Sequence, residues 1–216
     1  MDVPGAGSRL AAILITGDGR TEVKVVEALA ERIGCQAKAI LDSTRVLAGN
    51  KLARPTGLDP ALRAVSFLAR RLAERAERLP GFLVLIDREH VKDDPLESLK
   101  KYLESKVELV HSEPGDFAEL LTFSCRVGDK EMTLHLVILG RTLCTEECLL
   151  RLLELETGEA VPQPQDVKSL KDVLRNLLKE RGFERRRDLL KRADEDHLEA
   201  ALGPLLSALR CIKDDP

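Results

Sequence analysis

Two carboxylates separated by one residue, Asp87 and Glu89, directly follow an uninterrupted apolar run in this sequence. The run, residues 82–86, has no polar alternation and therefore predicts a strand buried on both faces, as in parallel sheets. Ligands of such sheets collect at the carboxyl ends of the strands. Residues at i and i+2 of an extended chain point to the same side, so both acids can bind one divalent cation. The pattern predicts a Mg²⁺ (or Mn²⁺) site; the alternative is that Asp87 only closes a turn or caps a helix.

Two further acids, Asp18 and Glu22, follow the first predicted strand at residues 10–15. If the first and third strands are neighbours in the sheet, these acids converge with Asp87 and Glu89. Asp18 or Glu22 would then be the catalytic residue, as an acid/base or as a further metal ligand. The competing interpretation for Glu22 is a favourable interaction with the helix N-terminus.

The loop between these acids contains two glycines but matches no familiar nucleotide motif. It lacks the third glycine of a dinucleotide-binding loop and the Gly-Lys-Ser/Thr of a P-loop. The residues that we expect to bind phosphate at the two strand ends are Gly17, Gly19, Arg20 and Arg88.

Strands and helices are predicted to alternate through the first part of the chain. Strands are expected at residues 10–15, 36–41 and 82–86, with helices at 22–33 and 59–79 between them. This order is typical of an α/β fold with a mainly parallel, Rossmann-like sheet and flanking helices.

The second half of the sequence predicts a hairpin followed by helices. Apolar segments at 117–127 and 131–139 flank the turn residues 128–130, and the chain beyond Pro162 and Pro164 has helical patterns. We therefore predict an α/β domain at residues 1–160 and a helical C-terminal extension, residues 161–216, that packs on it.

The motifs around these acids resemble those of TOPRIM domains, which topoisomerases, bacterial-type primases and several nucleases share. Gly17-Asp-Gly-Arg-Thr-Glu22 after the first strand looks like the first motif, and Leu83-Val-Leu-Ile-Asp87-Arg-Glu89 looks like the second. The segment from Thr21 onward is similar to archaeal and bacterial TOPRIM-like proteins. The resemblance covers residues 10–140 and implies a Mg²⁺-dependent nuclease or related domain acting on nucleic-acid phosphodiesters, with Asp87 and Glu89 as metal ligands.

The sequence departs from the TOPRIM pattern at two positions. Thr16 stands where the family has a glutamate at the end of the first strand, and Glu89 replaces an aspartate. Either Asp18 or Glu22 takes over from the missing glutamate, or the site is degenerate and binds phosphates or a partner without cleavage.

Two other classes of function remain open on the sequence. One is a non-catalytic α/β scaffold for nucleotide sensing or protein interaction, which gains support if Asp87 accepts hydrogen bonds from a neighbouring helix N-terminus. The other is a small phosphate-handling enzyme of Rossmann-like topology, such as a phosphotransferase.

Composition limits the partners and the location. The 216 residues carry a net charge of −3, so nucleic acid as a partner requires a local basic surface. Five scattered cysteines without a signal peptide predict a reduced, cytoplasmic protein, in which Cys144 and Cys148 are buried apolar residues rather than metal ligands. No apolar run reaches the roughly 18 residues of a membrane span. A homo-oligomer is compatible with the sequence.

Overall fold

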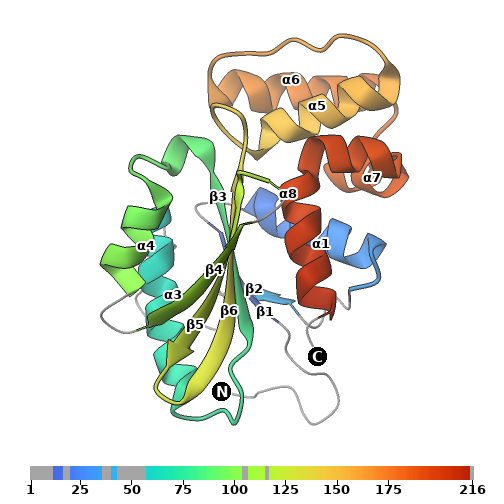
Figure 1. The fold of residues 1–216 in the computed structure, drawn as a ribbon. Helices are drawn as coiled ribbons and strands as arrows, with labels where there is room; N and C mark the ends of the chain where they lie inside the picture. The colour runs from blue at the N-terminus through green and yellow to red at the C-terminus, as the bar shows by residue number, and fades with distance from the viewer. Residues whose placement is uncertain are drawn as a thin grey trace.

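The computed structural model describes residues 12–16, 20–35, 40–42, 57–103, 107–114 and 117–214. Its strands are β1 (Ala12–Thr16), β2 (Ile40–Asp42), β3 (Gly81–Asp87), β4 (Glu108–Pro114), β5 (Leu120–Val127) and β6 (Lys130–Leu139). Its helices are α1 (Arg20–Arg32), α3 (Leu58–Ala73), η2 (Arg88–His90), α4 (Pro95–Leu103), α5 (Thr145–Thr157), α6 (Val167–Glu180), α7 (Arg186–Arg192) and α8 (Glu195–Asp214). Figure 1 shows that the strands form one sheet between two groups of helices.

The described strands form a mixed sheet in the order β2-β1-β3-β6-β5-β4. The pairings β1 with β2, β1 with β3, and β3 with β6 are parallel, whereas β5 pairs antiparallel with both β6 and β4. The predicted α/β class is confirmed. The parallel pattern expected from the sequence applies only to one part of the sheet, because β5 pairs antiparallel with both of its neighbours.

Strands β1 and β3 are neighbours, with Thr16 in register with Leu85. From β1 the chain passes first to β2 on one side and then to β3 on the other, so the connections diverge at this point. In doubly wound sheets, ligands bind in the crevice outside the carboxyl ends of the strands at such a switch point. The first and third strands are thus neighbours, which is the condition for the acids to converge, and this defines where a functional site is expected.

The core divides into two hydrophobic layers because successive side chains of a strand point to opposite faces. In β1, Ile13 and Ile15 belong to the layer under α3 and α4, whereas Ala12 and Leu14 belong to the layer under α1 and the C-terminal helices. All four are buried, which accounts for the absence of polar alternation in this strand.

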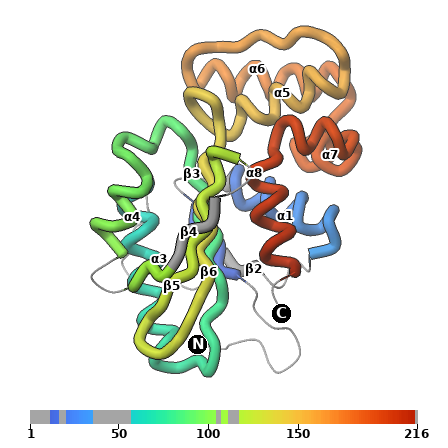
Figure 2. The backbone as a smooth tube through the Cα atoms, in the orientation of Figure 1, coloured from blue at the N-terminus to red at the C-terminus, as the bar shows by residue number. Residues whose placement is uncertain are grey.

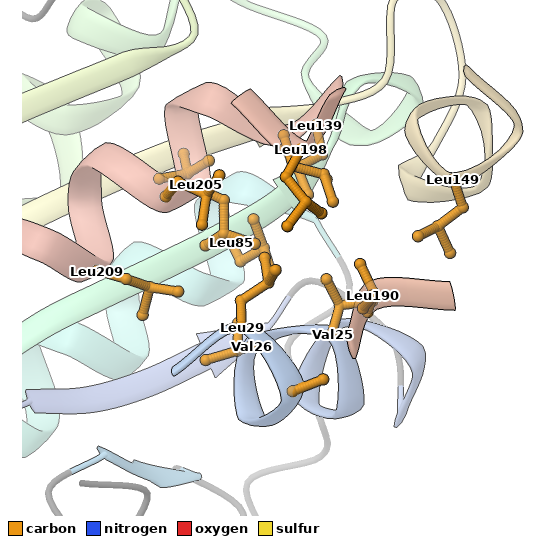
Figure 3. Close-up of a cluster of buried hydrophobic side chains, with 14 of the residues drawn as sticks. Val25, Val26, Leu29, Leu85, Leu139, Leu149, Leu190, Leu198, Leu205 and Leu209 are labelled. Atoms are coloured by element: carbon orange, nitrogen blue, oxygen red, sulfur yellow. The ribbon is translucent and has the colours of Figure 1, made fainter. Parts of the chain in front are cut away.

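The C-terminal helices and α1 share one hydrophobic layer on the sheet. Leu205 and Leu209 of α8 lie in the same buried cluster as Leu29 of α1 and Leu85 of β3, as Figure 3 shows. In the backbone trace of Figure 2, α7 and α8 lie close to α1, in agreement with the contacts between these helices. Helices α5, α6 and α7 lie at the end of the sheet where β3 and β6 end (Figure 1).

Helix α3 ends at Ala73, earlier than the sequence pattern predicts. The Lys130 ammonium, at the start of β6, donates to the carbonyl oxygens of Ala73 at 2.5 Å and Ala76 at 2.6 Å. A cation at the last carbonyls stabilises a helix C-terminus. Leu79, which the periodicity assigned to the helix, is buried in the segment that leads into β3. None of the described helices is long and apolar enough to cross a membrane.

Candidate functional site at the carboxyl ends of the strands

Asp87, at the end of β3, is buried and engaged by helix α5. Its Oδ1 accepts hydrogen bonds from the backbone N–H of Thr145 at 2.8 Å and from the Thr145 hydroxyl at 2.6 Å, and the residue is 5% exposed. The N-cap residue of α5, Cys144, has no capping side chain of its own. Asp87 therefore provides, from a neighbouring strand, an acceptor for one of the N–H groups that a helix start leaves without an intrahelical partner.

The loop between β6 and α5 is shaped so that Thr145 can reach Asp87. Gly140 has a φ of +88°, and a Cβ at this position would lie 2.7 Å from the Cys144 nitrogen, so only glycine fits. Glu147 accepts hydrogen bonds from the backbone N–H groups of Thr142 at 3.0 Å and Leu143 at 2.8 Å. Burial raises the pKa of the Glu147 carboxyl, but the hydrogen bonds from Leu143 and Thr142 outweigh it and leave the pKa below 4.5.

Glu89 does not share the environment of Asp87. The extended backbone ends at Asp87, and residues 88–90 form the single turn η2. Side chains at i and i+2 point to the same side only in an extended chain, so this expectation does not hold for Asp87 and Glu89. Glu89 Oε1 lies 3.8 Å from His90 Nε2, and its side chain is 27% exposed. Arg88, a predicted phosphate ligand, lies 4.0 Å from Glu119. The Glu89 backbone N–H donates to the Leu143 carbonyl at 2.8 Å and joins the two loops.

The other predicted site residues belong to the segment after β1. Glu22, in the first turn of α1, is 4% exposed, and Thr16 ends β1 next to β3. Gly17, Asp18 and Gly19 lie outside the described residues, and only the backbone of Arg20 is described, at the start of α1.

The described residues contain no group of three or more His, Cys, Asp or Glu side chains that could hold a metal ion. The Mg²⁺ site therefore stays a prediction. It would need ligands from the segment between β1 and α1 in addition to the acids at the end of β3.

A buried ion pair beside Thr145 was not predicted from the sequence. Glu146 is wholly buried, and its Oε1 lies 3.0 Å from Arg186 Nη2. Neither of its oxygens accepts a well-directed hydrogen bond within the described part of the chain. Arg186 also donates to the Thr21 hydroxyl at 2.6 Å, so one guanidinium joins α7, α5 and α1. The sequence signal was limited to an Arg-rich segment after α6, with nothing to indicate a buried partner.

A pocket of about 380 Å³ opens between α1 and α7, next to this ion pair. It is lined by Thr21, Lys24, Val25, Glu27, Arg185, Arg186, Arg187 and Leu190. Four cationic side chains and one carboxylate therefore face the same space. Such a pocket attracts anions, and Arg side chains recognise phosphate or carboxylate oxygens through paired N–H donors.

The five cysteines are free thiols. Burial raises the pKa of Cys148 to about 11, and burial together with the Glu146 charge raises that of Cys144 further. Since the thiolate is the nucleophile and the metal-binding form, neither residue is suited to these roles. This agrees with the interpretation of Cys144 as a buried apolar residue, whereas Cys148 is only partly buried.

The fold and this site define an α/β protein with a mixed sheet and a polar site at the carboxyl ends of its parallel strands. No protein-family model, curated protein or solved structure matches the chain. The resemblance to TOPRIM domains therefore depends on the two short motifs that end at Glu22 and Glu89.

Proposed function

We propose that this chain is a TOPRIM-like domain that binds nucleic-acid phosphodiesters at a degenerate site and does not cleave them. The single observation that carries the proposal is the engagement of Asp87 by Thr145. The carboxylate that the resemblance assigns to the metal is used to hold helix α5 in place.

Metal binding at Asp87 Oδ1 would compete with the hydrogen bonds that this oxygen accepts from Thr145. A cation at Asp87 Oδ1 would have to displace two hydrogen bonds to a charged acceptor, each worth about 1.5–3 kcal/mol. At the end of β1, Thr16 offers a hydroxyl where the family has a carboxylate. Both features reduce the number of carboxylate oxygens that could ligate Mg²⁺ here, which supports binding without cleavage.

The cationic pocket supplies the local attraction that the net charge of −3 does not. Its cations lie on α1 and at the start of α7. Contacts of Lys and Arg with phosphates make binding sequence-independent and dependent on salt.

The test is a titration of labelled single-stranded and duplex oligonucleotides in EDTA and in Mg²⁺. We expect single-strand binding in both buffers, no cleavage product, and an affinity that falls with salt with a slope of about −0.7 per phosphate contacted. Cleavage that requires Mg²⁺ or Mn²⁺ and disappears in Asp87→Asn would instead support the metal-dependent nuclease.

A second candidate is a non-catalytic α/β scaffold that senses a nucleotide. The engagement of Asp87 by the N-terminus of α5 favours it as well, and the pocket volume of about 380 Å³ is in the range of small-ligand sites. Calorimetric titration with mononucleotides separates the candidates, because this scaffold binds them and has no affinity for oligonucleotides.

A further inference from the structure

We propose that the pocket between α1 and α7 is a binding site for a nucleoside phosphomonoester, either the terminal phosphate of a nucleic-acid strand or a free nucleotide. The first of these ligands, the terminal phosphate of a nucleic-acid strand, rests on the proposed function, because it assigns the residues that would hold the nucleic acid. Within the described residues, the pocket is lined by none of the acids to which the TOPRIM resemblance assigns chemistry.

Two of the cations that line the pocket form no ion pair within the described part of the chain. Arg187 pairs with Glu31, and Arg186 pairs with Glu146. In contrast, Lys24 and Arg185 form no ion pair with any residue in the described ranges. Both are exposed, so their charges are available to an anion at little structural cost.

Arg186 gives the pocket a fixed cation. Its Nη1 is held by the Thr21 hydroxyl and its Nη2 by the buried Glu146, while the side chain stays 30% exposed. A guanidinium that is already oriented loses little conformational entropy when it binds a ligand. The pocket therefore combines one positioned cation with two that adapt to the ligand.

The charge and the size of the pocket favour a terminal phosphate over a phosphodiester. A phosphomonoester carries a charge of about −1.5 to −2 at neutral pH, whereas a diester carries one negative charge. A volume of about 380 Å³ suits a mononucleotide or a strand end, and it does not provide the extended groove that an internal stretch of strand requires.

The experiment compares two internally labelled single-stranded oligonucleotides that differ only in having phosphates or hydroxyls at both ends. Fluorescence anisotropy gives their affinities, and competition with unlabelled AMP and direct calorimetry with AMP test the free nucleotide. The variant is Lys24→Ala/Arg185→Ala. Its matched control is Lys171→Ala/Arg175→Ala on α6, which removes the same charge from an exposed surface away from the pocket.

We expect the phosphorylated oligonucleotide to bind on the order of tenfold more tightly, as for one or two charge-assisted hydrogen bonds. The preference should disappear in Lys24→Ala/Arg185→Ala and persist in the control. Competition by AMP would identify a free nucleotide as a ligand. Failure of AMP to compete would identify the terminal phosphate of the nucleic-acid strand as the ligand.

The results also separate this inference from the proposed function. Equal affinities for the two oligonucleotides without AMP binding would overturn the pocket assignment and leave nucleic-acid binding intact. A preference that survives in Lys24→Ala/Arg185→Ala would overturn the assignment as well. Binding of AMP without binding of either oligonucleotide would support the pocket and contradict the proposed function.

Discussion

Two neighbouring regions of this molecule differ in whether their charged side chains are buried or exposed. At the strand ends, Asp87 and Glu146 are buried, and their charges are met by Thr145 and Arg186. In the adjacent pocket, Lys24 and other cations face solvent. Buried charges must be satisfied within the chain, so the first region is committed to structure. Exposed charges that the chain leaves unmatched remain available to a ligand.

The largest expected effect comes from Arg186, which belongs to both regions. The Arg186→Ala substitution leaves the Glu146 carboxylate buried without its cation. We expect a loss of about 3 kcal/mol in the free energy of unfolding, the lower end for a broken buried pair because Arg186 is partly exposed. Urea denaturation of the native protein and the variant measures this difference.

A double-mutant cycle controls for the general effect of truncating a large side chain. Replacing both partners, in Glu146→Leu/Arg186→Ala, should recover much of the stability, because an apolar side chain at a buried site needs no counter-charge. If Arg186→Ala costs less than about 0.5 kcal/mol, the typical error of additivity, the structural role assigned to the buried pair is wrong.

The sequence predicted the features of this site that depend on local patterns. The uninterrupted apolar run identified β3 and placed Asp87 at its end, and the strand-helix order was compatible with β1 and β3 as neighbours. Both follow from residue periodicity and from the rules that connect parallel strands.

The partners of the acids depend on long-range packing and could not be read from the sequence. Thr145 lies 58 positions after Asp87, and their hydrogen bonds exist because β6 pairs with β3. Periodicity identifies a strand but does not say which strand it will pair with. Arg186 and Thr21 are 165 positions apart and meet only because α7 packs on α1.

The next largest effect concerns Asp87 and Glu89, the two acids at and just after the end of β3. Asp87→Ala leaves the N–H and the hydroxyl of Thr145 without their acceptor at a buried helix start, and we expect a loss of about 2 kcal/mol. Glu89→Ala, at a partly exposed turn, should change stability by less than about 0.5 kcal/mol.

Urea denaturation of the native protein and of these two variants with and without Mg²⁺ tests the metal site. A ligand that binds only the folded state raises the urea midpoint. An increase in the midpoint of the native protein with Mg²⁺, absent in both Asp87→Ala and Glu89→Ala, would assign these acids to a metal and contradict their purely structural role.

The smallest effect is the dependence on pH of the loop that positions Thr145. The pKa of Glu147 is below its usual 4.5 in the folded protein, because its hydrogen bonds to Leu143 and Thr142 outweigh the effect of burial. A depressed carboxyl pKa stabilises the fold at pH values above the unfolded-state pKa, and the contribution is lost as the pH falls through the folded-state pKa. Stability should therefore decrease below about pH 4.5 in part through this residue.

The Glu147→Gln substitution isolates this contribution. At neutral pH we expect it to cost about 0.5 kcal/mol, a low value because the partly exposed carboxylate is also hydrated. The difference between native protein and variant should shrink as the pH falls below 4.5, since protonation removes the charge that the substitution removes. Glu97→Gln, at an exposed position of α4, controls for the loss of one charge. A difference that stays constant through the acid range would mean that the loop is held by its backbone geometry at Gly140 and not by the Glu147 carboxylate.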